Sequence, residues 1–135
     1  MKSGNPGELR AHSVAAAFRY ALQGVSAAWR EQQNFRIHAV MGACVAGLGV
    51  AARLDATRWA LLVFAIALVL AAELANTALE ALVDLVSPDE HPLAGRAKDV
   101  AAAGVLIAAA AAVVIGLLVF VPVALRSGAP GGGVL

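Results

Sequence analysis

The stretch AAELANTALEALVD, residues 71–84, places three carboxylates, an amide and a hydroxyl in an otherwise apolar segment. On an α-helix these five polar residues fall within an arc of about 100° and form one stripe, which we call the polar stripe. A carboxylate that faces lipid is costly, so we expect the stripe to face protein or water. The members of the polar stripe are Glu73, Asn76, Thr77, Glu80 and Asp84.

The composition around this stretch is that of a membrane protein. Of the 135 residues, 61% are hydrophobic, and the mean hydropathy is +0.79, whereas soluble domains are about 45–50% apolar. Residues 35–52, 59–86 and 100–123 can each supply the roughly 20 residues that a spanning helix needs. A net charge of +1 gives no reason to expect nucleic-acid binding. The sequence therefore predicts an all-α membrane protein with three spanning helices.

The segment before the first span has helical periodicity. Its apolar residues recur at spacings of four, three and four positions and share one stripe of a helix over residues 13–33. They are Phe18, Leu22, Val25 and Trp29. We expect an amphipathic helix at the membrane surface, and a helix packed on a soluble core is the alternative. Residues 1–12 and 125–135 are expected to be flexible, which leaves one membrane domain over residues 13–124.

The basic residues predict the orientation in the membrane. Seven of the ten fall on the side that carries the N-terminus and the connection between the second and third spans, so we expect that side to be cytoplasmic. ATP is also found there. The seven are Lys2, Arg10, Arg19, Arg30, Arg36, Arg96 and Lys98, and the other three are Arg53, Arg58 and Arg126.

The polar stripe has a chemical interpretation and a structural one. Glu73 is its deepest member, and carboxyl groups with few cations nearby suit a general base. Glu80 is shallower and offers oxygen ligands to a hard cation such as Mg²⁺. Alternatively, the stripe holds helices together by hydrogen bonds. Three carboxylates fit that alternative poorly, because the spans contain almost no Lys or Arg to neutralise them.

The connection SPDEHPLAGRAKD, residues 87–99, gathers charges at the membrane surface. Lys98 and Asp99 stand at the entrance to the third span, where a lysine can bind polyphosphate oxygens and an acidic residue can position a metal or a ribose. No GxxxxGK[ST] or GxGxxG fingerprint occurs, so no standard nucleotide-binding fold is expected. Taken alone, the connection is better interpreted as an ordinary charged loop.

Together these segments resemble a known family. The stretch AELANTALEALVD, followed by HPLAGRAKDVAAAGVL and preceded by FRYALQG, AAW and NFRIH, resembles the bacterial integral-membrane diacylglycerol kinases. That family includes the undecaprenol kinases, and the resemblance covers residues 14–122. It implies a homotrimer of three-span subunits in the bacterial inner membrane. It also implies transfer of the γ-phosphate of MgATP to a lipid hydroxyl.

The resemblance also implies residue roles. The catalytic base falls on Glu73, an orienting amide on Asn76, and a metal ligand on Glu80. Lipid contacts fall on Phe18, Trp29 and Glu73. Nucleotide contacts fall on Tyr20, Glu80, Asp89, Glu90, His91, Lys98 and Asp99.

One departure concerns the metal. The family's second metal-binding glutamate falls on Gln32, which brings no charge, and Glu31 beside it is a possible replacement. The segments NFRIH and HPLA favour undecaprenol over diacylglycerol as the acceptor. Two other classes stay open: a non-catalytic membrane subunit, in which the polar stripe serves packing, and a small transporter, in which Glu73 carries a proton or cation.

Overall fold

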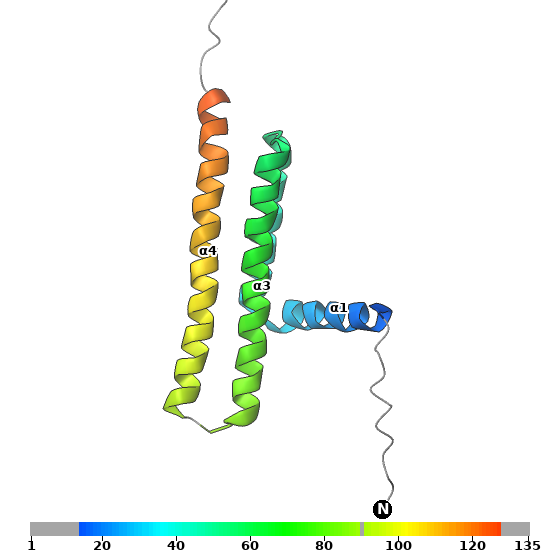
Figure 1. Cartoon of the computed structure of the whole chain (residues 1–135), viewed down its shortest axis with the longest axis vertical. Helices are drawn as coiled ribbons and strands as arrows, with labels where there is room; N and C mark the ends of the chain where they lie inside the picture. Colours follow the sequence, from blue (N-terminus) through cyan, green and yellow to red (C-terminus); the bar gives the residue numbers. More distant parts are fainter. Residues whose placement is uncertain (1–13, 90, 128–135) are drawn as a thin grey trace, which may run out of the picture.

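The computed structural model describes residues 14–89 and 91–127, which form four helices and no strand. Helices α2, α3 and α4 run side by side, and α1 projects away from them (Figure 1). The expected flexible first segment and most of the expected tail lie outside the described residues, as does Glu90. The helices are α1 (Val14–Glu31), α2 (Gln33–Ala51), α3 (Ala56–Val86) and α4 (Pro92–Ser127).

Three of these helices, α2, α3 and α4, are long and apolar enough to cross a membrane, which confirms the predicted fold class. With 31 and 36 residues, α3 and α4 are about 46 and 54 Å long. Both exceed the roughly 30 Å hydrocarbon core of a bilayer. The hairpin end that joins them extends past the level of α1 (Figure 1).

Helix α4 begins at Pro92, well before the expected start at residue 100. Proline is well suited to the first turn of a helix, because the N–H that it lacks has no partner within the helix there. The backbone N–H of Leu93 donates to Nδ1 of His91 at 3.2 Å and so caps the start. Lys98 and Asp99 therefore lie within the first turns of α4, and the expectation that they belong to a loop was wrong.

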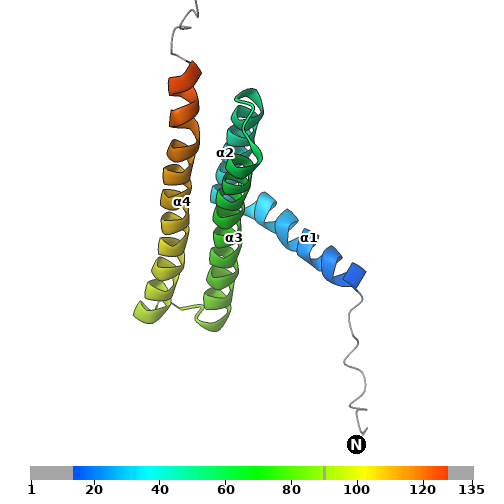
Figure 2. The same cartoon turned by 45° about the horizontal axis from the view of Figure 1, so that its top comes forward.

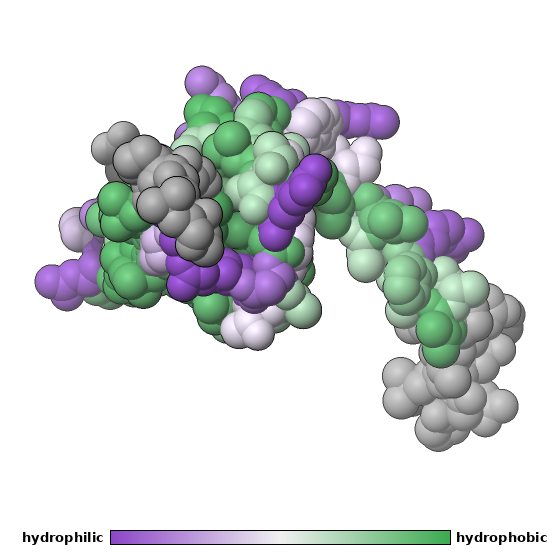
Figure 3. Space-filling view, turned by 90° about the horizontal axis from the view of Figure 1, so that it is seen from above, coloured by the Kyte–Doolittle hydropathy of each residue, from purple (hydrophilic) through white to green (hydrophobic). Residues whose placement is uncertain are grey.

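Helix α1 presents an apolar face that no other part of the described chain covers. Phe18 is 69% exposed and Leu22 is 64% exposed, and only Ala28 is buried in this helix. Seen from above, the side of α1 that faces the upper ends of the spanning helices is largely hydrophobic (Figure 3). This arrangement fits a helix that rests on a membrane surface and contradicts packing on a soluble core.

The core lies on both faces of α3. Leu62 of α3 and Val119 of α4 are each 2% exposed and cluster with Leu54 toward the end of the bundle that is remote from the α3–α4 hairpin. Helix α3 packs against α2 and α4 (Figure 2). A Cβ atom at Gly49 would lie 3.1 Å from the Trp59 ring, so this glycine allows the start of α3 to approach α2 closely.

Candidate active site

The polar stripe faces the inside of the molecule at its Glu73 end. Glu73 is 3% exposed and is the buried charged residue of the described chain. Asn76, Thr77 and Glu80 are partly buried, whereas Asp84 at the far end of the stripe is exposed. The stripe thus runs along α3 from a buried carboxylate toward the open hairpin end.

The buried carboxylate has a partner that the sequence analysis did not assign. Nε2 of His38 lies 3.2 Å from Oε1 of Glu73, and the His38 side chain is 25% exposed. Only Lys and Arg were considered as partners for the carboxylates in the sequence analysis, and the residue that contacts Glu73 is a histidine. His38 belongs to α2, and a contact between two helices cannot be found from the periodicity of either one. The available signal was an ionisable residue near the start of an apolar span.

Asn76 and Glu80 form the next part of the stripe. Nδ2 of Asn76 donates to Oε1 of Glu80 at 2.9 Å, one helical turn apart. Oδ1 of Asn76 is buried and has no hydrogen-bond partner in the described chain. A buried acceptor without a partner is costly, which marks this oxygen as available to a ligand or a cation.

A magnesium ion fits the donors at this point. Oδ1 of Asn76 and the carboxylate of Glu80 are hard oxygen donors of the kind that Mg²⁺ prefers. The described residues contain no cluster of three or more His, Cys, Asp or Glu side chains that could hold a metal.

The junction of α1 and α2 contains Glu31 and Gln32, the two residues predicted as alternative metal ligands. Gln32 interrupts the helices, and its backbone N–H donates to the carbonyl of Ala28 at 2.9 Å. Nη1 of Arg36 donates to the carbonyl oxygens of Trp29 and Arg30 at 3.0 Å and so closes the end of α1. The metal role of Glu31 and Gln32 stays a prediction.

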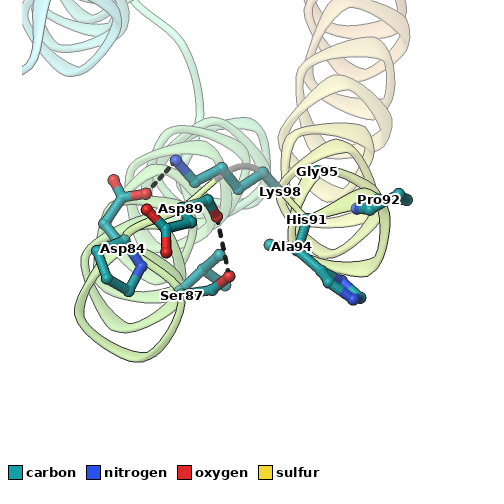
Figure 4. A pocket seen from close by; sticks show the side chains of 10 residues that line it. Asp84, Ser87, Asp89, His91, Pro92, Ala94, Gly95 and Lys98 are labelled. Carbon is teal, nitrogen blue, oxygen red and sulfur yellow. Dashed lines mark hydrogen bonds and ion pairs between the residues drawn. The ribbon is translucent and has the colours of Figure 1, made fainter.

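The hairpin end of α3 and α4 contains a cavity of about 540 Å³, which we call the hairpin pocket. Nζ of Lys98 pairs with Oδ1 of Asp84 at 2.5 Å across it, and Oγ of Ser87 donates to the carbonyl of Asp89 at 3.1 Å (Figure 4). His91 lines the same pocket. Three of the predicted nucleotide contacts, Asp89, His91 and Lys98, are therefore brought together here, while Asp99 is not among the lining residues.

A second cavity lies along the membrane-spanning part of the bundle. It has a volume of about 250 Å³ and is lined by α2 and α4 over a floor of α3, and we call it the α2–α4 groove. Its lining is apolar except for His38, which stands at the end nearest the polar stripe. The predicted contacts Phe18, Tyr20 and Trp29 line neither the groove nor the hairpin pocket. Arg19 lies over the ring of Tyr20 at 5.3 Å.

Comparison with known proteins identifies the family. The model of prokaryotic diacylglycerol kinase matches residues 19–120. The chain belongs to the prokaryotic diacylglycerol kinase family. This is a bacterial family of membrane-embedded, ATP-dependent lipid kinases, and the three long apolar helices agree with it.

Three relatives bear on the substrate. A diacylglycerol kinase of Synechocystis sp. is 45% identical over 83% of this chain, which spans 65% of that protein's length. An undecaprenol kinase of Bacillus subtilis is 37% identical over 78% of this chain and 86% of that protein. A diacylglycerol kinase of Escherichia coli is 36% identical over 75% of this chain and 83% of that protein. The relatives thus include kinases named for each of the two lipids.

Proposed function

We propose that this kinase transfers the γ-phosphate of ATP to the hydroxyl of a membrane lipid at the Glu73 end of the polar stripe. The observation that carries the proposal is the location of this buried carboxylate between two unlike spaces. His38, in contact with Glu73, lines the apolar α2–α4 groove. In the other direction the stripe leads through Asn76 and Glu80 to the hairpin pocket. A lipid can enter from one side and a nucleotide from the other.

The chemistry requires one proton transfer and one displacement. Glu73 takes the proton from the lipid hydroxyl, the freed oxygen attacks the γ-phosphorus, and the bond to the bridging oxygen breaks to release ADP. Asn76 holds the reacting groups in line, and its unpartnered Oδ1 is the atom available for that purpose. Burial of Glu73 keeps water from competing with the lipid hydroxyl as the acceptor.

The hairpin pocket is the proposed nucleotide site. Lys98 supplies a cation for the phosphate oxygens once it leaves Asp84, and His91 and Asp89 line the space around it. Tyr20, Glu90 and Asp99 remain further proposed contacts on the strength of the resemblance. Bound Mg²⁺ would neutralise phosphate charge beside Glu80 and Asn76, with Glu31 or Gln32 as a further protein ligand.

For the lipid we propose undecaprenol, with diacylglycerol as the competing acceptor. The α2–α4 groove is apolar along its length and has one polar residue at the end near Glu73, so its lining suits the part of either lipid chain that lies next to the hydroxyl. Phe18 and Trp29 are exposed on the membrane-facing side of α1 and would contact the lipid at the interface.

We also propose the assembly and orientation. Three subunits form the enzyme in the bacterial cytoplasmic membrane, and the N-terminus and the hairpin pocket face the cytoplasm, in line with the seven-to-three division of basic residues. Three spans give one subunit few faces with which to surround a substrate, which favours a site shared between neighbours. Mixed trimers of Glu73→Gln and Lys98→Ala chains should then recover activity, and their failure to do so would argue for sites within single subunits.

The test is transfer of labelled γ-phosphate from MgATP to undecaprenol and to diacylglycerol, measured in parallel in mixed micelles. Glu73→Gln should lower the rate by about 10²- to 10⁴-fold, the range expected for a general base. Asp55→Asn is the matched control, since it makes the same carboxyl-to-amide change at the other end of α3 and Asn is also a good helix cap.

Each outcome has a distinct meaning. Undecaprenol labelling that disappears in Glu73→Gln supports the base and the acceptor together. Preference for diacylglycerol keeps the mechanism and corrects the acceptor. Absence of transfer to both lipids by folded wild-type protein would reject the kinase mechanism and favour a packing or transport role for the polar stripe.

A further inference from the structure

We propose that His38 is a positioning residue that fixes the carboxylate of Glu73 for proton abstraction. This inference rests on the proposed function and goes beyond it, because nothing in that mechanism required a residue of α2. The contact between His38 and Glu73 connects the apolar α2–α4 groove with the polar stripe. His38 lines the α2–α4 groove, and its Nε2 lies 3.2 Å from Oε1 of Glu73.

The geometry leaves one carboxylate oxygen for the substrate. A glutamate side chain has three rotatable bonds, so a base that must meet a lipid hydroxyl gains from having one oxygen held. With Oε1 engaged by the imidazole, Oε2 is the atom that can accept the proton. General-base catalysis requires the base within about 2.6–3.2 Å of the proton donor, and such an anchored carboxylate meets that requirement more often than a free one.

Burial gives the contact its importance. The Glu73 side chain is only 4% exposed, and in the described chain His38 is the residue that forms an ion-pair contact with it. A buried carboxylate without a polar partner is unfavourable and tends to reorient toward water. The Glu73 carboxylate can reach water by turning along the polar stripe toward Asn76 and Glu80, and these two residues already bond to each other. Without His38, Glu73 is expected to turn away from the groove and from the lipid hydroxyl.

Histidine suits this role better than a permanent cation. A Lys or Arg side chain at the same place would favour the ionised carboxylate and make it a weaker base. An imidazole N–H can hold one oxygen without carrying a permanent charge into the apolar segment. Arg36, the other ionisable residue at the start of α2, is occupied by the carbonyl oxygens at the end of α1 and does not compete for Glu73.

The test compares two substitutions of His38 that differ in one property. His38→Leu fills similar space without a donor, and His38→Gln keeps an N–H donor near the position of Nε2. Kinetics are measured with the full-length protein in mixed micelles with MgATP and the lipid that the wild-type enzyme phosphorylates. Val45→Ala is the control for a change in groove shape, because Val45 lines the same groove on α2. Gel filtration and thermal melting establish that each variant is folded.

We expect His38→Leu to lower kcat by about 10- to 100-fold, the loss associated with a misplaced reacting group, with KM for ATP and lipid changed by less than about twofold. His38→Gln should recover most of kcat. Val45→Ala should affect KM for the lipid rather than kcat. In a Glu73→Gln background, neither His38 change should alter the residual rate, because the group that His38 positions is then absent.

Three results would overturn the inference: an unchanged kcat in His38→Leu, no recovery by a folded His38→Gln variant, or losses that multiply with that of Glu73→Gln. Each leaves the kinase mechanism standing, because wild-type transfer is intact in the same experiment. Wild-type protein that transfers phosphate to neither lipid rejects the proposed function, and the role of His38 with it. The two failures are therefore distinguishable.

Discussion

Replacing Asp84 by Asn is expected to lower KM for ATP, although it removes a polar contact. In the structure Asp84 holds Lys98 across the hairpin pocket at 2.5 Å. A lysine that binds phosphate must first leave that carboxylate, so the ion pair opposes nucleotide binding. Removing the carboxylate leaves the lysine free and also removes a negative charge that repels ATP.

The solvent exposure of the Asp84–Lys98 ion pair determines how large the change in KM for ATP should be. The Asp84 side chain is 64% exposed and that of Lys98 is 37% exposed, and ion pairs in such surroundings contribute about 0.2–1 kcal/mol. If the whole free energy of the ion pair is added to the free energy of ATP binding, KM for ATP decreases by about 1.4- to 5-fold. The ratio between wild type and variant should shrink at high salt, because the Debye length falls from about 10 Å at 0.1 M to about 3 Å at 1 M.

The assay is an ATP titration at saturating lipid for wild type, Asp84→Asn, Lys98→Met and the double variant. In the Lys98→Met background the Asp84 change should have little effect, since the group that it releases is absent. A KM that rises tenfold or more in Asp84→Asn would refute this reasoning and make Asp84 itself a ligand of the nucleotide or its metal.

Four further substitutions test packing, the groove and acid stability. Gly42→Ala would place a methyl carbon 2.9 Å from a side-chain carbon of α3 and should lower the free energy of unfolding in an SDS titration by roughly 1–3 kcal/mol. Gly47→Ala, with nothing within 4 Å, should not lower it. Gly116→Leu adds a side chain to the α2–α4 groove and should raise KM for the lipid by about tenfold while leaving KM for ATP unchanged. The hydrogen bond from the backbone N–H of Arg58 holds the pKa of Asp55 in the folded protein below its ordinary 3.8. The stability that ionised Asp55 contributes is therefore present above pH 3.8 and is lost as the pH falls through the lowered pKa of the folded state. Asp55→Asn should not show this loss in the same titration at low pH.

The sequence was most informative where one helix contains the whole pattern. The polar stripe depends only on spacings within α3, and burial follows it: Glu73 is buried, whereas Leu79 and Leu82 between its members are exposed. The apolar face of α1 was predictable for the same reason. Both patterns repeat with the period of an α-helix, and no knowledge of neighbouring helices is needed to recognise them.

Two features were beyond such reasoning, for different physical reasons. The start of α4 was placed too late because residues 87–99 were interpreted as a charged connection, whereas Pro92 occupies the first turn of the helix and His91 caps it. The contact between His38 and Glu73 depends on how α2 and α3 pack and on their relative depth, and neither is encoded in the period of one helix. The residues found from the sequence are therefore those of one stripe, and the partner from another helix was missed.

The relative depth of the helices explains how an apolar protein can contain three carboxylates on one stripe. Helix α1 marks the membrane surface, and His38 lies only five positions after Gln33, where α2 begins, or about 8 Å along the helix. Because Glu73 contacts His38, it lies near that same shallow depth. The thirteen positions from Glu73 to Val86 then carry α3 about 20 Å further, past the level of α1 (Figure 1). Of the three carboxylates in the polar stripe, Glu73 is thus the buried one, Glu80 is partly buried, and Asp84 at the hairpin end is exposed.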